Sequence, residues 1–257
     1  MPLNFDFDFK KPDYVMVFKH RLERLQRIRE QEKRTPGALA VLKQFYRDDP
    51  AQFIIDWGVT FDPRNGARGL PSVIPFLLFP KQEEWVNWAV NLIKERKSGV
   101  IEKSRDMGVT CLFMAFFCTM NIFNREMVFG VASRKEEYVD ELGSPKCLLY
   151  KGRQFMSHLP PEFRGSWIEQ KHSPFKKIKF PDSNSIISGE AGDGIGRGDR
   201  TTATAVDEAA WLMRPELVDA SLSQTTNTVF WVSTPHGRNN PFAHKRFGGK
   251  LDVFTFH

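Results

Sequence analysis

This chain is organised around the stretch Lys103-Ser104-Arg105-Asp106-Met107-Gly108-Val109-Thr110. It lies between two apolar segments, residues 99–101 and residues 111–117. A short β-like segment, a glycine-containing polar loop and a helix are the parts of a phosphate-binding loop, in which N–H groups and the helix N-terminus point at an anion. The common pattern G-x-x-x-x-G-K-[ST] has its lysine just before the hydroxyl residue, whereas here Lys103 stands first and Val109 occupies the lysine position. Alone, the stretch leaves a phosphate loop and an ordinary loop both open.

The composition limits the possible size, partners and location of the protein. A chain of 257 residues, 41% hydrophobic and 13% aromatic, can bury the core of one large domain with an appendage. The net charge of +6 permits a nucleic-acid partner but is also common in proteins without one. Cys111, Cys118 and Cys147 form no C-x-x-C pair and predict buried thiols in a reducing compartment. No secretory signal is visible, and the longest apolar run, residues 111–120, is about half of the ~20 residues that span a membrane. We therefore expect a soluble, intracellular protein.

The first 50 residues predict a small helical appendage. Residues 1–17 alternate Phe5, Phe7 and Phe9 with acidic residues, which favours a strand-like or docking arm. Residues 18–34 and 38–47 have helical apolar spacing. The many basic residues of the first helix fit a solvated face at least as well as a nucleic-acid contact.

The middle of the chain continues the α/β pattern. Residues 51–78 mix aromatic and turn residues and predict a loop-rich connector. Residues 126–133 predict a strand buried on both faces, followed by Arg134 and Lys135, which could reach a phosphate or a nucleic-acid backbone or simply be surface charges. Residues 177–188 predict a β-hairpin.

A glutamine and a glycine-rich loop are further candidates. Gln82 falls in the first turn of a helix predicted up to Arg96, where its amide could meet both edge atoms of an adenine, or could be an ordinary helix-start residue. Residues 192–200 alternate glycine with other residues and include Arg197 and Arg200. Such a loop suits a mobile catalytic or contact element, and equally a plain surface loop.

Two predicted strands end in polar residues. Residues 202–206 deliver Asp207 and Glu208, an arrangement that phosphoryl transfer needs, since one carboxylate holds the Mg²⁺ shell and the next orients and deprotonates water. Residues 228–232 precede Ser233-Thr234-Pro235, and hydroxyls at such a strand end can sense a γ-phosphate and pass its loss to a neighbouring element. A last strand is expected over residues 251–256.

In this order and spacing, residues 76–256 resemble the ATPase half of the large terminase subunit of tailed bacteriophages, the motor that pumps DNA into a preformed capsid. The most specific pieces are V-D-E-A-A-W at 206–211 and V-S-T-P-H-G at 232–237. The resemblance implies an α/β P-loop NTPase fold of the ASCE type, with a mostly parallel central sheet flanked by helices. Residues 51–257 would form the ATPase domain and residues 1–50 the helical appendage.

The resemblance also implies roles for single residues. The implied ATP-binding residues are Gln82 as the adenine contact, then Lys103, Ser104, Arg105, Asp106, Met107, Gly108, Val109 and Thr110. Thr110 and Asp207 would hold Mg²⁺, and Ser233, Thr234 and Pro235 resemble the coupling motif. The implied catalytic residues are Glu208 as the general base, Lys103 and Arg105 in place of the charge missing at Val109, and Arg197 as an arginine inserted into the neighbouring subunit's site, with Arg200 as its alternative. Some terminases similarly place the lysine at the head of the loop.

At the level of the whole protein, the resemblance implies ATP hydrolysis coupled to translocation of double-stranded DNA, with ATP and Mg²⁺ as cofactors. The implied partners are DNA, the portal protein or procapsid, the small terminase subunit and further copies in a ring of five, with a monomer in isolation and no membrane. The expected place is the cytoplasm of the infected host, transiently on the procapsid and not in the mature virion. Because family members add a ribonuclease-H-like nuclease domain, for which no room remains after His257, we expect an excised ATPase domain or a separate nuclease.

Two alternatives stay open. A helicase or another nucleic-acid-dependent ATPase shares the glutamine, phosphate-loop and Asp-Glu elements, but would need a second motor lobe. A DNA-binding or portal-docking module with a degenerate nucleotide site is the other alternative, and Val109 is its best support.

Overall fold

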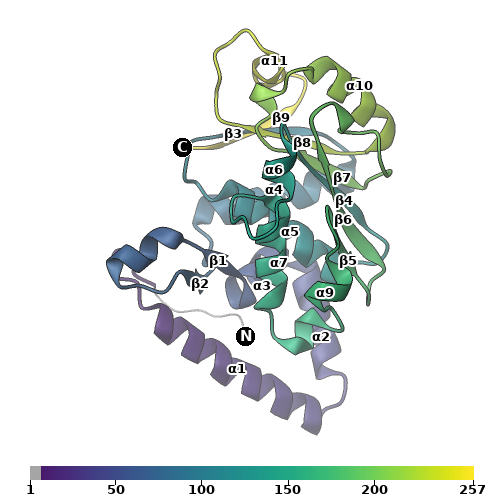
Figure 1. The fold of residues 1–257 in the computed structure, drawn as a ribbon. Coiled ribbons are helices and arrows are strands. Elements are labelled where there is room, and N and C mark those ends of the chain that lie inside the picture. Colours follow the sequence, from purple (N-terminus) through teal and green to yellow (C-terminus); the bar gives the residue numbers. More distant parts are fainter. Residues whose placement is uncertain (1–6) are drawn as a thin grey trace.

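The computed structural model describes residues 7–257, and a seven-stranded sheet forms its centre (Figure 1). The strands are β3 (Gly99–Lys103), β4 (Val128–Ser133), β5 (Lys177–Phe180), β6 (Ser185–Ala191), β7 (Ala203–Val206), β8 (Val229–Ser233) and β9 (Asp252–Phe256). Their order is β5-β6-β4-β7-β8-β3-β9, and neighbours run parallel except for the antiparallel hairpin of β5 and β6. The mostly parallel sheet and the hairpin that the sequence predicts are confirmed.

Helices cover both faces of this sheet. They are α4 (Pro80–Glu95), α5 (Val109–Phe123), α6 (Glu136–Val139), α7 (Leu148–Ser157), α8 (Pro161–Arg164), α9 (Glu169–His172), α10 (Pro215–Thr225) and α11 (Pro241–Phe247), with short 3-10 turns η2 (Gly192–Gly194) and η3 (Ala209–Trp211). Alternate strand residues supply two cores. Ile101 packs in the larger core with α4, α5 and α7, and Val100 packs in the smaller core with α10 and α11. This two-sided burial explains why the strands read as continuous apolar runs.

Helix α5 is the central helix of the larger core. Its Phe117 ring stacks on Phe129 of β4 with centroids 4.3 Å apart, and its Phe113 meets Trp85 of α4 at 4.4 Å. Such aromatic pairs add to the burial energy through their ring geometry. The helix that follows the phosphate loop is thereby fixed against the sheet. No helix within residues 7–257 is long and apolar enough to cross a lipid bilayer.

The chain before the sheet is more helical than predicted. Helix α1 (Tyr14–Arg34) begins before residue 18, because the Asp13 side chain accepts a hydrogen bond from Met16 N–H at 2.9 Å and caps the helix. The strand-like arm predicted over residues 1–17 is wrong for its described part, since residues 7–13 form no strand. Residues 1–6, with Phe5, lie outside the described residues. Helix α2 (Ala38–Asp48) confirms the second predicted helix.

The prediction of a loop-rich connector over residues 51–78 is wrong at its start, where helix α3 (Pro50–Trp57) forms. Proline fits the first turn of a helix, and Asp49 caps it by accepting from Gln52 N–H at 3.0 Å. Phe53 of this helix is fully buried. A small two-stranded sheet follows, β1 (Val59–Phe61) and β2 (Val73–Pro75), joined through the 3-10 turn η1 (Pro63–Arg68).

Helix α1 lies along the lower edge of the view in Figure 1 and is fastened to α3 by buried polar contacts. Arg24 Nη1 lies 2.6 Å from a carboxylate oxygen of the fully buried Asp56. Arg21 donates to the Gly58 carbonyl at 2.8 Å. Leu25 and Tyr46 belong to the same apolar cluster as the sheet. A division of the chain at residue 50 stays a prediction.

Candidate nucleotide-binding site

The loop between β3 and α5 has the geometry of an anion site. It is turned by positive φ angles at Asp106 (64°) and Gly108 (66°). The first backbone hydrogen bond of α5 runs from Leu112 N–H to the Gly108 carbonyl at 3.0 Å, so the N–H groups of the first helical turn have no helical partner. Free N–H groups at a helix N-terminus carry partial positive charge and favour a phosphate.

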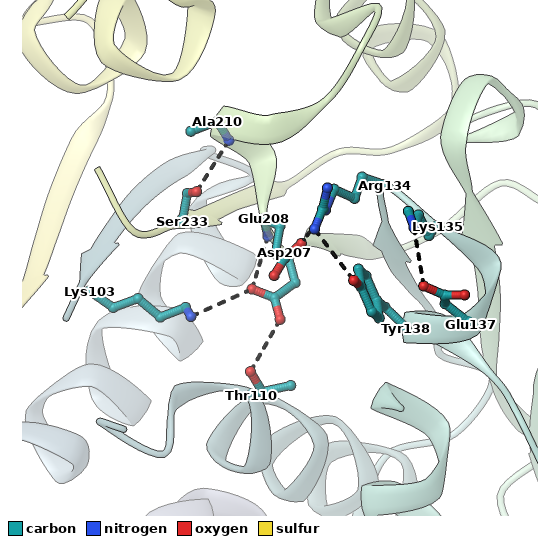
Figure 2. Close-up of polar contacts among 10 residues, drawn as sticks. All are labelled: Lys103, Thr110, Arg134, Lys135, Glu137, Tyr138, Asp207, Glu208, Ala210 and Ser233. Carbon is teal, nitrogen blue, oxygen red and sulfur yellow. Dashed lines mark hydrogen bonds and ion pairs between the residues drawn. The ribbon is translucent and has the colours of Figure 1, made fainter. Parts of the chain in front are cut away.

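Three side chains predicted from separate parts of the sequence meet beside this loop (Figure 2). Thr110 Oγ1, in the first turn of α5, donates to Asp207 Oδ2 at 3.1 Å. Lys103 Nζ, from the end of β3, lies 4.0 Å from Asp207 Oδ1. Asp207 is placed there because it directly follows β7 and its N–H donates to the Ala132 carbonyl of β4 at 2.8 Å. A cation, a hydroxyl and a carboxylate thus converge at the carboxyl edge of a parallel sheet, where ligands of such folds bind.

The structure explains how a lysine at the head of the loop can serve this site. Val109 is 2% exposed and packs in the larger core, so the side chain at this position is directed into apolar surroundings. Lys103 and Asp207 have side chains 17% and 18% exposed. The cation at the site therefore comes from the strand. Arg105 is exposed and has no polar partner within residues 7–257, and its catalytic role stays a prediction.

Gln82 is engaged inside the protein. Its Oε1 accepts from Phe79 N–H at 3.1 Å, and its Nε2 donates to the Met107 carbonyl at 3.2 Å. The side chain is 4% exposed. These two bonds fasten the start of α4 to the phosphate loop. The role of Gln82 as the adenine contact stays a prediction.

Glu208 is held by a residue whose role the sequence reasoning missed. Arg134 Nε, just after β4, donates to Glu208 Oε2 at 2.6 Å, and this bond raises the pKa of Arg134. Arg134 also donates to the Tyr138 hydroxyl at 3.4 Å (Figure 2). Glu208 itself has φ of 56°, a left-handed conformation that is unfavourable for a residue with a side chain and is often found at functional sites. The signal was available only through the strand order, because β4 and β7 are neighbours, Arg134 directly follows β4 and Glu208 lies two residues beyond β7.

The Ser233 end of β8 contacts the segment that follows Glu208. Ser233 is fully buried, and its Oγ accepts from Ala210 N–H at 3.2 Å. Next to it the rings of Trp211 and His236 stack with centroids 3.6 Å apart. The Arg134 guanidinium lies over the Trp211 ring at 5.9 Å. Thr234 and Pro235 follow Ser233, and their part in coupling stays a prediction.

The glycine loop is fastened by an acidic side chain. The Glu190 carboxylate accepts from Gly196 N–H at 2.5 Å and from Gly198 N–H at 2.9 Å, and Ile195 is fully buried. Arg197 and Arg200 are exposed, and their side chains make no hydrogen bond or ion pair with any part of residues 7–257. The structure does not join either arginine to the site of Asp207 and Glu208.

The parallel sheet, its flanking helices and the loop before α5 form a fold like that of P-loop NTPases. No protein-family model and no curated protein matches the sequence. Among solved structures, the chain is similar to the large terminase of bacteriophage HK97, with 11% identity, a TM-score of 0.57, and coverage of 82% of this chain and 43% of that one. It is also similar to the large terminase of the thermophilic bacteriophage D6E in complex with ADP, with 16% identity, a TM-score of 0.51, and coverage of 70% of this chain and 45% of that one.

The same D6E protein in complex with ATP-gamma-S gives 18% identity and a TM-score of 0.50, with coverage of 69% of this chain and 44% of that one. The chain thus spans less than half of the length of these terminases. The resemblance to large terminases is confirmed at the level of the fold, which is that of their ATPase domains.

Proposed function

We propose that this chain is the ATPase motor domain of a viral large terminase, which couples ATP hydrolysis to translocation of double-stranded DNA into a procapsid. The observation that carries the proposal is the convergence of Lys103, Thr110 and Asp207 at the N-terminus of α5. The likeness in fold to terminases, including one solved with ADP, supports it. ATP would place its phosphates along Lys103–Thr110, against the free N–H groups and the Lys103 ammonium.

The donor set fits a magnesium ion. The Thr110 hydroxyl and the Asp207 carboxylate lie 3.1 Å apart, and both offer the hard oxygen atoms that Mg²⁺ prefers. Mg²⁺ sites in phosphoryl-transfer proteins commonly use one or two such protein ligands and complete the shell with phosphate oxygens and water. When bound there, the ion would supply charge neutralisation on the phosphates.

The remaining chemistry falls to Glu208 and Arg134. Glu208 is the proposed general base, which orients a water and accepts its proton. In the structure its Oε2 is occupied by Arg134, so the ion pair must open, or the free oxygen must be used, before the base can act. The Arg134 bond therefore holds the base in a resting arrangement. Ser233 is bonded to Ala210, two residues after Glu208, and would pass a change at this base to the chain that follows β8.

The wider assembly follows from the same proposal. Arg197, whose exposed side chain has no hydrogen-bond or ion-pair partner in the described chain, would complete the site of a neighbouring copy in a ring, with Arg200 as the alternative. Double-stranded DNA, the portal protein or procapsid and the small terminase subunit are the proposed partners, in the cytoplasm of an infected host.

Phosphate release from ATP, measured with Mg²⁺ and with or without double-stranded DNA and procapsid, tests this function. We expect slow basal hydrolysis that rises on assembly. Asp207→Asn should abolish both rates, while Glu216→Gln, at an exposed acidic residue outside the site, should keep them. A wild-type protein without hydrolysis under all conditions, or an Asp207→Asn variant as active as wild type, would contradict the proposal.

A further inference from the structure

A pocket of about 660 Å³ opens beside the phosphate loop. Asp106, Met107 and Gly108 line its loop side. Its other walls are rich in aromatic side chains, among them Phe9, Tyr14, Phe61 and Phe79. The volume is within the range of about 300–1,000 Å³ that holds small-molecule ligands. A nucleotide whose phosphates lie on the loop could therefore place its base in this pocket.

The arm of residues 7–13, which precedes α1, supplies part of the aromatic wall. The Phe9 ring lies 4.7 Å from the ring of Phe79, and the Phe7 ring stacks on Tyr14 at 5.8 Å. Phe9 and Phe79 nevertheless remain 47% and 51% exposed. Two large, adjacent and half-exposed rings beside a phosphate site offer apolar faces that a planar base can cover.

The charged side chains that line the pocket, and Gln82, are engaged with the protein itself. Arg64 bonds to Asp62 at 2.9 Å and pairs with Asp106 at 3.5 Å. Lys81 pairs with Glu84 at 2.7 Å. Both ends of the Gln82 amide are used by Phe79 N–H and the Met107 carbonyl. Reading the edge of a base by any of these groups would break an existing contact, whereas stacking breaks none.

We propose that the arm of residues 7–13 and Phe79 form a stacking wall for the base of the bound nucleotide, with Phe9 and Phe79 as the contacting rings. The base is held by its face, and Gln82 orders the phosphate loop instead of reading the base edge. This inference rests on the proposed nucleotide site and deepens it. Because every base has a π-face, stacking discriminates poorly between bases. ADP and GDP should therefore bind within about tenfold of each other.

Calorimetric titration with ADP, GDP and inorganic tripolyphosphate tests whether the stacking wall contacts the base. Phe9→Ala and Phe79→Ala should each weaken ADP binding by about 5- to 100-fold, the effect of losing one stacking contact. Tripolyphosphate, which has no base, should bind these variants as it binds wild type. Phe9→Trp should retain ADP affinity. Phe175→Ala, at a 63% exposed ring outside the pocket, is the matched control and should change nothing.

Three outcomes would overturn the inference without touching the proposed function. Unchanged ADP affinity in both alanine variants would show that the rings do not contact the base. An equal loss of ADP and tripolyphosphate affinity would show that the variants damage the phosphate loop instead. A preference for ADP over GDP of a hundredfold or more would show that the base edge is read. If wild type binds none of the three ligands, the proposed function fails, and the inference fails with it.

Discussion

At the scale of single residues, the position of one cation decides whether this site can handle a nucleotide. Val109 is buried in the core, and the only lysine in direct ion-pair reach of Asp207 in the described chain is Lys103. A lysine on a strand end and a hydroxyl on the next helix can meet the same phosphate because the loop between them folds back. The unusual order of residues in the loop is therefore compatible with the ordinary chemistry of a phosphate site.

Lys103→Ala should lower ATP turnover by about 100-fold or more, since removing one preorganised charge donor from a reaction site typically has that effect. Arg105→Ala, which removes an exposed arginine of the same loop without a partner in residues 7–257, is the comparison and should have the smaller effect. Steady-state phosphate release at saturating ATP measures both. Unchanged turnover in Lys103→Ala would remove Lys103 from the site.

For Arg134 we expect the opposite effect on ATP hydrolysis. Its bond to Glu208 is partly exposed, with side chains 33% and 38% accessible, and such pairs contribute up to about 1 kcal/mol. Arg134→Ala should therefore free the base and raise basal ATP hydrolysis by up to about fivefold. The double variant with Glu208→Gln should be inactive. An Arg134→Ala variant as inactive as Glu208→Gln would instead place Arg134 on the phosphates.

At the scale of elements, the strands were predictable from the sequence, but the order in which they pair in the sheet was not. The phosphate loop, the strand before Asp207 and the strand before Ser233 have local signals, namely apolar runs that end in polar residues. The start of α3 was misread because Pro50 and the aromatic residues beyond it resemble a connector, although proline is favoured in a first turn. The Arg134–Glu208 pair and the Ser233–Ala210 bond depend on strand order, which periodicity alone does not contain.

The docking of α1 gives a prediction at this scale. Arg24 pairs with the buried Asp56, whereas Arg27 of the same helix pairs with the exposed Glu23 at 3.8 Å. Arg24→Ala removes one partner of a buried carboxylate and should lower the free energy of unfolding by about 3 kcal/mol. Arg27→Ala should change it by less than about 1 kcal/mol. Denaturant titration measures both, and equal effects would contradict the described docking of α1.

At the scale of the whole molecule, the parallel sheet brings the separate motifs together. Asp207 and Glu208 follow β7, Ser233 ends the neighbouring β8, and Lys103 ends β3 beside it, so all four lie at one edge of the sheet. Arg197 is the exception, because it is exposed on a fastened loop and contacts none of them. An arginine in this position can complete a site only if the loop moves or if another copy provides it.

Hydrolysis measured against protein concentration tests the second possibility. We expect the rate per chain to rise with concentration, and Arg197→Ala to remove the rise while leaving nucleotide binding intact. The same measurement on Arg200→Ala identifies which of the two arginines acts. A rate strictly proportional to protein concentration and undiminished in both variants would exclude an arginine acting between copies.

The proposed ATPase activity depends above all on Glu208 as the general base. Single-turnover phosphate release from bound ATP, compared between wild type and Glu208→Gln, tests it most directly. We expect the variant to bind ATP as tightly as wild type but to release phosphate at least about 100-fold more slowly, the usual effect of losing a general base. Equal rates of phosphate release in the two proteins would contradict it.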